Sequence, residues 1–206
     1  MKDWSALEEA AAALRRLNSA VAAFEVSDDD LRATGLAATE LSERLEAGRP
    51  RNREQDIAAL PTVAAPDLST TGPDADRVEF DPFSLGGGRL NPASVGIDFR
   101  RESTTSVTAR CTVDGMFQGP PGRVHGGVVA LIVDELMSMI NRLLGRRAFT
   151  VRLQVNLRAA TPVGTELTFR AWEERVDGRK VVIRAEGRVG EQLIVEADAL
   201  FVMVPG

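Results

Sequence analysis

The first fifty residues repeat their apolar positions at alternating intervals of three and four, the spacing of one side of an α-helix. The first repeat forms a narrow seam of the coiled-coil type. It runs through Leu7, Ala10, Leu14, Leu17, Val21 and Phe24. Ser5 and Glu8 stand at the start of this stretch with the spacing of a capping box, so we expect Ser5 to cap the helix.

A second helix is predicted to follow. Ser27 precedes three aspartates at 28–30, and acidic residues in a first turn are stabilised by the positive end of the helix dipole. The weaker apolar seam of this helix passes through Leu31, Thr34, Ala38, Leu41 and Leu45. Gly48 and Pro50 then end the helix. Residues 1–49 are thus predicted to form a helical hairpin that serves as a packing arm or dimer brace, with a lid over a site as the alternative.

The helical periodicity stops in residues 50–82. This stretch is rich in Pro, Thr, Asp and Gly, and we interpret it as a linker with at most short structure. Residues 83–206 have a different pattern, in which apolar and polar residues alternate. The alternation appears first in 95–99 and again in 106–113, which predicts two half-buried strands.

One long apolar helix is predicted over 126–144, with Gly145 as its C-terminal stop. Four strands are predicted after it, over 150–158, 166–176, 180–189 and 193–204. In the first of them, alternation places Val151, Leu153, Val155 and Leu157 on one face and Thr150, Arg152, Gln154, Asn156 and Arg158 on the other. The pair Asp177-Gly178 predicts a hairpin turn. Because strands and helices do not alternate, we expect an α+β fold with one helix against a largely antiparallel sheet.

Composition narrows the possible functions. A formal net charge of −5 argues against a general nucleic-acid binder, which usually needs a basic face. The longest apolar stretch contains Asp134, Glu135 and Arg142, so we do not expect a membrane span. With one histidine and one cysteine, no metal site is expected, and Cys111 is expected to be a small buried filler. The first residues lack the uninterrupted apolar core of a signal peptide, so we expect a soluble, cytoplasmic protein.

The single histidine, His125, lies in the run Gly-Pro-Pro-Gly-Arg-Val-His-Gly-Gly that spans residues 119–127. Gly126 and Gly127 allow close approach of a ligand to the backbone and open the predicted helix without side chains. A helix N-terminus offers unpaired N–H donors and a positive dipole end, which together suit an oxyanion. An ordinary tight turn is the alternative for the tripeptide alone, but the flanking residues favour a ligand site.

Asp134 and Glu135 stand between apolar residues in the middle of the predicted helix. Asp134 shares a helix face with Ala130, Leu131, Met137 and Ser138, and a carboxylate on such a face is costly to bury without a purpose or a partner. We therefore interpret Asp134 as a candidate base or nucleophile, with a satisfied core carboxylate as the alternative. Glu135 is interpreted as a solvated or structurally paired acid.

The spacing of Gly126 and Asp134 along the predicted helix limits how the two residues can act together. Eight helical residues separate Gly126 from Asp134, which corresponds to roughly 12 Å at about 1.5 Å per residue. One protomer therefore cannot place the Gly126 amide and the Asp134 carboxylate on a single reacting carbon. If both act in one reaction, we expect them to come from different subunits across a two-fold interface.

A basic stretch follows the predicted helix. Residues 136–165 contain no acid and five arginines, Arg142, Arg146, Arg147, Arg152 and Arg158. Guanidinium groups bind phosphate in a bidentate manner, so a phosphorylated ligand would suit this stretch. Solvated strand and helix faces are the alternative.

These residues together resemble the hotdog-fold acyl-CoA thioesterases of the PaaI-like group. The resemblance rests on the run at 119–127, on the aspartate nine residues after the histidine, and on the later strand that is followed by Thr161-Pro162. It covers roughly residues 80 to 206 and leaves the helical hairpin outside. It implies a hotdog fold, in which an antiparallel sheet wraps one long central helix, over residues 83–206.

The resemblance also implies roles for individual residues. The Gly126 amide would polarise the thioester carbonyl, and His125 would shape or support that site. Asp134, supplied by the partner subunit, would act as general base for water or as nucleophile, and Thr150 matches a hydroxyl position near the attacking water. Further candidates for substrate contact are Gly119, Gly127, Ser138, Arg146, Arg147, Arg152 and Arg158.

Two positions depart from the pattern of the family. Many members carry Asn or Gln shortly before the histidine, whereas here Gln118 lies seven residues upstream and Gly119 six. The strand residue that is often aromatic in the family is Leu157. Hotdog dehydratases also use a histidine and an acid, but their His-Phe-Pro-Gly type of run is absent from the sequence.

The expected function is hydrolysis of an acyl-CoA thioester to a carboxylic acid and free CoA, by a homodimer or homotetramer with its sites at the subunit interface. No metal or redox cofactor is expected, because coenzyme A is part of the substrate. Two alternatives stay open. One is a non-catalytic hotdog module that binds acyl-CoA or another protein, and the other is a thioesterase for acyl groups on a carrier protein.

Overall fold

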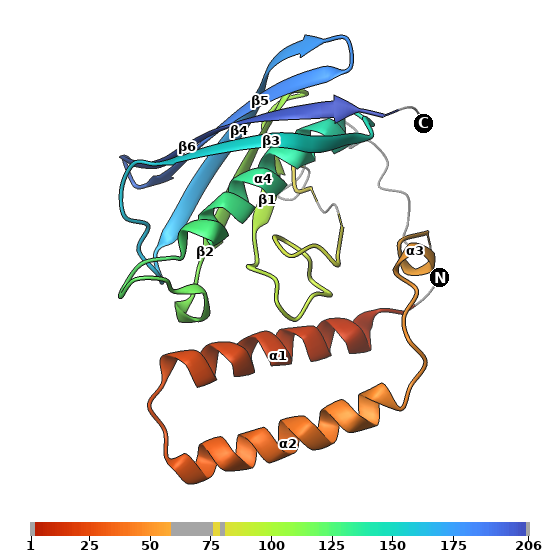
Figure 1. Cartoon of the computed structure of the whole chain (residues 1–206), viewed down its shortest axis with the longest axis vertical. Coiled ribbons are helices and arrows are strands. Elements are labelled where there is room, and N and C mark those ends of the chain that lie inside the picture. Colours follow the sequence, from red (N-terminus) through yellow and green to blue (C-terminus); the bar gives the residue numbers. More distant parts are fainter. Residues whose placement is uncertain (1–2, 59–75, 79–80, 205–206) are drawn as a thin grey trace.

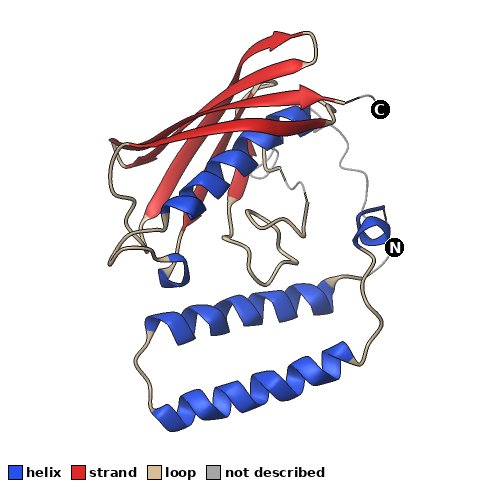
Figure 2. Ribbon diagram, in the orientation of Figure 1, coloured by secondary structure: helices blue, strands red, loops and turns tan. Residues whose placement is uncertain are grey.

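The computed structural model describes residues 3–58, 76–78 and 81–204 (Figure 1). Its larger part is one six-stranded antiparallel sheet that curves around a long helix, α4 (Gly126–Leu143), as Figure 2 shows. Across the sheet the strands are β1 (Asp98–Arg101), β2 (Ser106–Thr112), β4 (Glu166–Asp177), β5 (Lys180–Val189), β6 (Gln192–Met203) and β3 (Ala148–Leu157). This arrangement confirms the predicted α+β class and leaves β3 at one edge of the sheet.

The core forms between α4 and the concave face of the sheet. The helix buries seven apolar side chains, those of Val129, Ile132, Val133, Leu136, Met137, Met139 and Ile140. They meet inward-facing residues such as Phe169, Ile183 and Phe201. Each such buried side chain contributes about 1.5–3 kcal/mol relative to exposure, so α4 and its ends are fixed rigidly in the domain.

Most predicted ends of these elements are confirmed. Gly145 follows the last turn of α4 with a φ of +64°, the left-handed conformation that stops a helix. The hairpin near Asp177 joins β4 to β5, because Asp177 pairs with Lys180 and Gly178 has a φ of +54°. Cys111 is buried in β2, as predicted.

The predicted strand over 95–99 is mostly wrong. β1 begins only at Asp98, because the residues before it belong to a compact loop over 81–97. In that loop the amide of Val95 donates to the carbonyl of Leu85 at 2.9 Å, and the amide of Ile97 donates to that of Gly86 at 3.1 Å. These backbone groups are thus satisfied within the loop rather than in a sheet.

The predicted helical hairpin is present as α1 (Ser5–Ala23) and α2 (Asp28–Glu46). Ser27 caps α2 by accepting a hydrogen bond from the Asp30 amide, as expected. The capping box at Ser5 is wrong, because Ser5 is already helical and Trp4 occupies the cap position without a side-chain bond. Burial of Trp4 against the ring of Phe83, with centroids 5.5 Å apart, accounts for this entry of the chain into α1.

Polar contacts hold α1 against the rest of the protein. Arg15 donates to the carbonyl of Asn91 at 2.7 Å, and Ser19 donates to the Asp114 carboxylate at 2.5 Å. Asp114 in turn caps the short 3₁₀ helix η1 (Gly115–Phe117), which precedes the histidine. The helix α1 therefore connects the loop over 81–97 with the segment that leads into α4.

The predicted linker contains one short helix, α3 (Arg53–Ala58). Residues 59–75 and 79–80 of that linker lie outside the described residues. Among the described helices, none is both long and apolar enough to cross a membrane.

Candidate active site

Asp134 and Thr150 lie side by side on one flank of α4. The Thr150 hydroxyl donates to Oδ1 of Asp134 at 3.1 Å. Asp134 is half-buried and Thr150 is exposed, so the pair opens to solvent at the edge of the sheet. A carboxylate with an ordered hydroxyl beside it has the composition needed to hold and activate a water molecule.

A β-bulge in β3 produces this contact. Thr150 pairs with Phe201 and Arg152 pairs with Leu200, so Val151 is an extra residue in the ladder. The insertion turns Thr150 toward α4, on the same face as Leu153 and Val155. The prediction that Thr150 shares a face with Arg152 is therefore wrong, because strict alternation ignores the bulge.

His125 forms the N-cap of α4. Its Nδ1 accepts the Gly127 amide at 3.0 Å, and its own amide donates to the Phe117 carbonyl at 2.9 Å. With Nδ1 in this role, the proton of the neutral ring resides on Nε2. The imidazole is exposed, so Nε2–H is a donor that faces solvent beside the helix end.

The Gly126 amide is the first N–H of α4, and it has no acceptor among the residues that the structure describes. A Cβ at Gly126 would lie 3.1 Å from Cδ1 of Leu157, so the end of β3 packs closely against this amide. Gly119 is equally confined, since a Cβ there would lie 3.0 Å from Cα of His125. The helix end therefore presents an unpaired, positively polarised donor, as the sequence predicts.

Gly126 and Asp134 lie on the same helix but two turns apart, so one chain does not bring them together. Thr150 lies beside Asp134 and Leu157 beside Gly126, which places the two half-sites at opposite ends of β3. Ser138, one turn beyond Asp134, is half-buried and has no hydrogen-bond contact among the described residues that would assign it a role.

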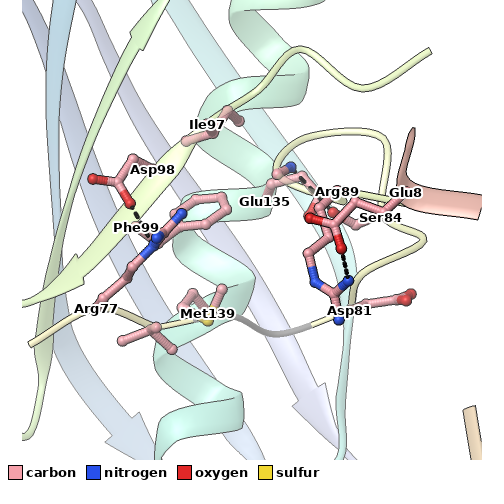
Figure 3. Close-up of a pocket in the computed structure, with 12 residues that line it drawn as sticks. Glu8, Arg77, Asp81, Ser84, Arg89, Ile97, Asp98, Phe99, Glu135 and Met139 are labelled. Atoms are coloured by element: carbon pink, nitrogen blue, oxygen red, sulfur yellow. Dashed lines mark hydrogen bonds and ion pairs between the residues drawn. The ribbon is translucent and has the colours of Figure 1, made fainter. Parts of the chain in front are cut away.

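Glu135 points toward the loop over 81–97 (Figure 3). It borders a cavity of about 480 Å³ that is also lined by Met139, Phe99 and Ser84. Burial raises the pKa of this carboxyl, while the Gly86 amide and Arg142 partly offset the effect. Of the two interpretations of Glu135, a structurally paired acid therefore fits its position better than a solvated acid.

That cavity is separate from the Asp134 pair. Charged side chains that line the cavity form ion pairs with one another (Figure 3). Nη1 of Arg89 lies 2.5 Å from Oε2 of Glu8, and Nε of Arg77 lies 3.2 Å from Oδ1 of Asp98. No periodic pattern in the sequence predicts this cavity, because the loop over 81–97 lacks regular structure. Among the described residues, no group of three or more His, Cys, Asp or Glu side chains could hold a metal ion.

The arginines do not form one patch. Arg152 pairs with Asp198 at 3.1 Å and Arg158 with Glu196 at 2.6 Å, and Arg146 pairs with Glu173. Arg152 lies on the face of β3 that points away from α4. Arg147 is exposed and forms no ion pair with the described part of the chain. It is therefore the arginine of this group best suited to an added anion.

Comparison with known proteins identifies the domain. Residues 121–196 match the family model described as the thioesterase superfamily. This part of the chain, which contains α4, is similar to the thioesterase superfamily. The matched residues include His125, the whole of α4 and Thr150, so both half-sites lie inside the thioesterase domain.

Curated relatives agree with this assignment. The acyl-coenzyme A thioesterase THEM4 of Xenopus laevis is 31% identical over 87 residues, which are 41% of this chain and 39% of the relative. The acyl-coenzyme A thioesterase THEM5 of Mus musculus is 26% identical over 89 residues, 42% of this chain and 36% of the relative. The matches thus span less than half the length of these curated relatives.

Solved structures confirm the hotdog fold of the thioesterase domain. A crystal structure of a thioesterase superfamily protein superposes with a TM-score of 0.74 at 25% identity, over 95% of this chain and 94% of that one. A hypothetical thioesterase from Streptococcus pneumoniae, solved with coenzyme A, shares the fold with a TM-score of 0.50 at 16% identity, over 52% of this chain and 85% of that one.

Proposed function

We propose that this protein hydrolyses acyl-CoA thioesters to a carboxylic acid and free coenzyme A. The hydrogen bond between Thr150 and Asp134 is the observation that carries the proposal, because it provides an oriented carboxylate at the open edge of a thioesterase domain. The names of the relatives THEM4 and THEM5 support acyl-CoA as the substrate class.

The chemistry follows from these groups. In the general-base route, Asp134 takes a proton from a water held beside Thr150, and the water oxygen attacks the carbonyl carbon of the thioester. In the nucleophilic route, the carboxylate attacks that carbon itself and water then cleaves the anhydride. In both routes the C–S bond breaks, coenzyme A leaves as a thiolate and gains a proton, and no redox or metal cofactor takes part.

The Gly126 amide would stabilise the oxyanion that forms on the carbonyl oxygen. A preorganised backbone donor at a helix N-terminus acts where negative charge develops, which lowers the barrier rather than only binding the substrate. His125 holds the turn through its bond to Gly127 and leaves Nε2–H as a second donor at the same helix end.

A two-fold dimer would complete the site. β3 is an edge strand with exposed apolar side chains, including Phe149 at 64% and Val151 at 58% exposure, and such edges favour pairing with another strand. Antiparallel pairing of two β3 strands brings the Thr150 end of one beside the Leu157 end of the other. Asp134 of one protomer then approaches Gly126 of its partner, which fits a homodimer or a homotetramer built from such dimers.

Coenzyme A would also need contacts for its phosphates. Arg147 is the arginine that supports this part of the proposal, since Arg146, Arg152 and Arg158 are already paired with carboxylates. The structure of the S. pneumoniae relative was solved with coenzyme A, which is consistent with this class of ligand.

The test is release of free thiol from a panel of acyl-CoAs by the purified protein and by Asp134→Asn. We expect turnover of at least one acyl-CoA and a fall of about 10³-fold in kcat for the variant. Absence of thiol release from every chain length would contradict the proposal and favour a binding module. Release only from acylated carrier protein would contradict the choice of substrate.

A further inference from the structure

The helix α2 exposes an apolar seam. Its 19 residues include none that is buried. Leu31, Leu41 and Leu45 of the seam are 42%, 52% and 77% exposed. A single amphipathic helix in water gains little stability from its own hydrogen bonds and depends on burial of its apolar face. Some surface must therefore cover this seam.

The seam of α1 is also uncovered. The helix contacts the rest of the protein through Ala11, Arg15 and Ser19, which lie on a different side from its leucines. Leu14, Leu17 and Val21 are partly exposed and turn away from the thioesterase domain. Figure 1 shows the two helices as an open hairpin, with α1 between α2 and the thioesterase domain.

The side chains of this hairpin do not fill the space between its helices. A cavity of about 930 Å³ lies at the base of the hairpin, where Leu7 and Leu14 of α1, Leu45 of α2 and the segment after α2 line it. The hairpin lies within the 95% of the chain that superposes on the solved thioesterase superfamily protein, so its placement beside the domain recurs in a relative. We propose that the hairpin of a second copy of this chain packs against both seams and forms an intermolecular four-helix bundle.

Charge favours a second copy as the occupant. The tip of the hairpin, residues 25–32, has four acids and one arginine, a net charge of −3. The opposite end of α2 and the turn after it, residues 43–51, have three arginines and two glutamates, a net charge of +1. Two hairpins related by a two-fold axis and placed tip to base bring each acidic tip beside the arginines of the other copy, so the surface is self-complementary.

The size of the surface is sufficient for such an interface. A helix of 19 residues is about 28 Å long, and a contact strip about 10 Å wide along it covers roughly 280 Å². Four such strips, two from each copy, bury about 1,100 Å², which reaches the roughly 1,000 Å² expected of a specific interface. The bundle then has apolar positions at its centre and charged positions outside, as in other antiparallel four-helix bundles.

Cross-linking of the full chain tests this proposal independently of enzymatic activity. Ala38→Cys places a thiol in the seam near the middle of α2, and Leu36→Cys places one on the opposite face as the control. The natural Cys111 does not interfere, because it is buried and burial raises the pKa of its thiol to about 12. A short bis-maleimide is added to each dilute purified variant.

We expect Ala38→Cys to form a covalent dimer and Leu36→Cys to remain a monomer on a denaturing gel. Adding Leu31→Glu and Leu41→Glu to the Ala38→Cys chain should abolish the dimer, while thermal unfolding monitored by fluorescence confirms that the domain stays folded. Equal cross-linking at both positions, or none at Ala38→Cys, would overturn the proposal and indicate that the seams close on each other or cover a different partner.

Discussion

The Thr150 hydroxyl donates a hydrogen bond of 3.1 Å to Oδ1 of Asp134, and this bond joins the edge strand to the central helix. It fixes one carboxylate oxygen and leaves the other free for a water molecule. The relationship connects the geometry of β3 directly with the proposed chemistry, so removal of either functional group should alter turnover.

Thr150→Val should lower kcat by about 10²-fold, because it removes the hydroxyl and keeps the β-branched shape. Thr150→Ser retains the hydroxyl and is the matched control, with a loss of only a few-fold expected. Steady-state kinetics with the best acyl-CoA measures both variants. Equal activity of Thr150→Val and the natural protein would show that the hydroxyl has no part in the reaction.

Deletion of Val151 should keep most of the turnover. Thr150 would then directly precede Arg152, and normal alternation places it on the face opposite to Arg152, toward α4. Val151→Thr keeps the bulge and is also expected to keep most of the activity. Circular dichroism establishes the fold of each variant, and loss of activity in a folded deletion variant would show that Thr150 needs the bulge itself for its position.

The bulge in β3 could not be predicted from the sequence. The pattern of 150–158 alternates without interruption, and nothing in it marks Val151 as inserted. The register is decided by contacts that Thr150 and Leu153 make with α4, which lie far away in the sequence. The prediction of a strand over 95–99 is wrong for a similar reason, since the amides of Val95 and Ile97 form hydrogen bonds within their own loop.

Features with local causes were predictable. Ser27 caps α2 with a nearby amide, Gly145 takes a left-handed conformation after α4, and Asp177 begins a tight hairpin. The candidate residues His125 and Asp134 could be predicted because the single histidine precedes two glycines and the aspartate lies within an apolar helix. The capping box failed at Ser5, where tertiary burial of Trp4 overrides the local motif.

Gly126→Pro should lower kcat by about 10²–10³-fold, because it removes the N–H that would bind the oxyanion. Proline suits the first position of a helix, and the extended backbone of His125, with ψ of 133°, suits a residue before proline. Gly126→Ala adds the same contact with Leu157 but keeps the amide, so its loss should be much smaller. Kinetics of the two variants side by side distinguish the donor from the steric effect.

Glu135 should make stability depend on pH. Burial raises its pKa in the folded protein above the ordinary 4.5, so the native state binds a proton more tightly than the unfolded state. This contribution is present in full below pH 4.5 and is lost as the pH rises through the raised pKa. Glu135→Gln should therefore gain stability relative to the natural protein at pH 8 more than at pH 4, as measured by urea unfolding. An equal difference at both pH values would exclude this titration.

The shared site can be tested most directly by mixing two inactive variants. Asp134→Asn and Gly126→Pro are each expected to be nearly inactive alone. When the two are unfolded together and refolded at equal concentrations, half of the dimers contain one of each chain, and each of these has one intact site. The mixture should then regain about a quarter of the natural activity if each site takes Gly126 from one protomer and Asp134 from its partner. No recovery in mixtures shown to contain the mixed dimer would contradict a site shared between subunits.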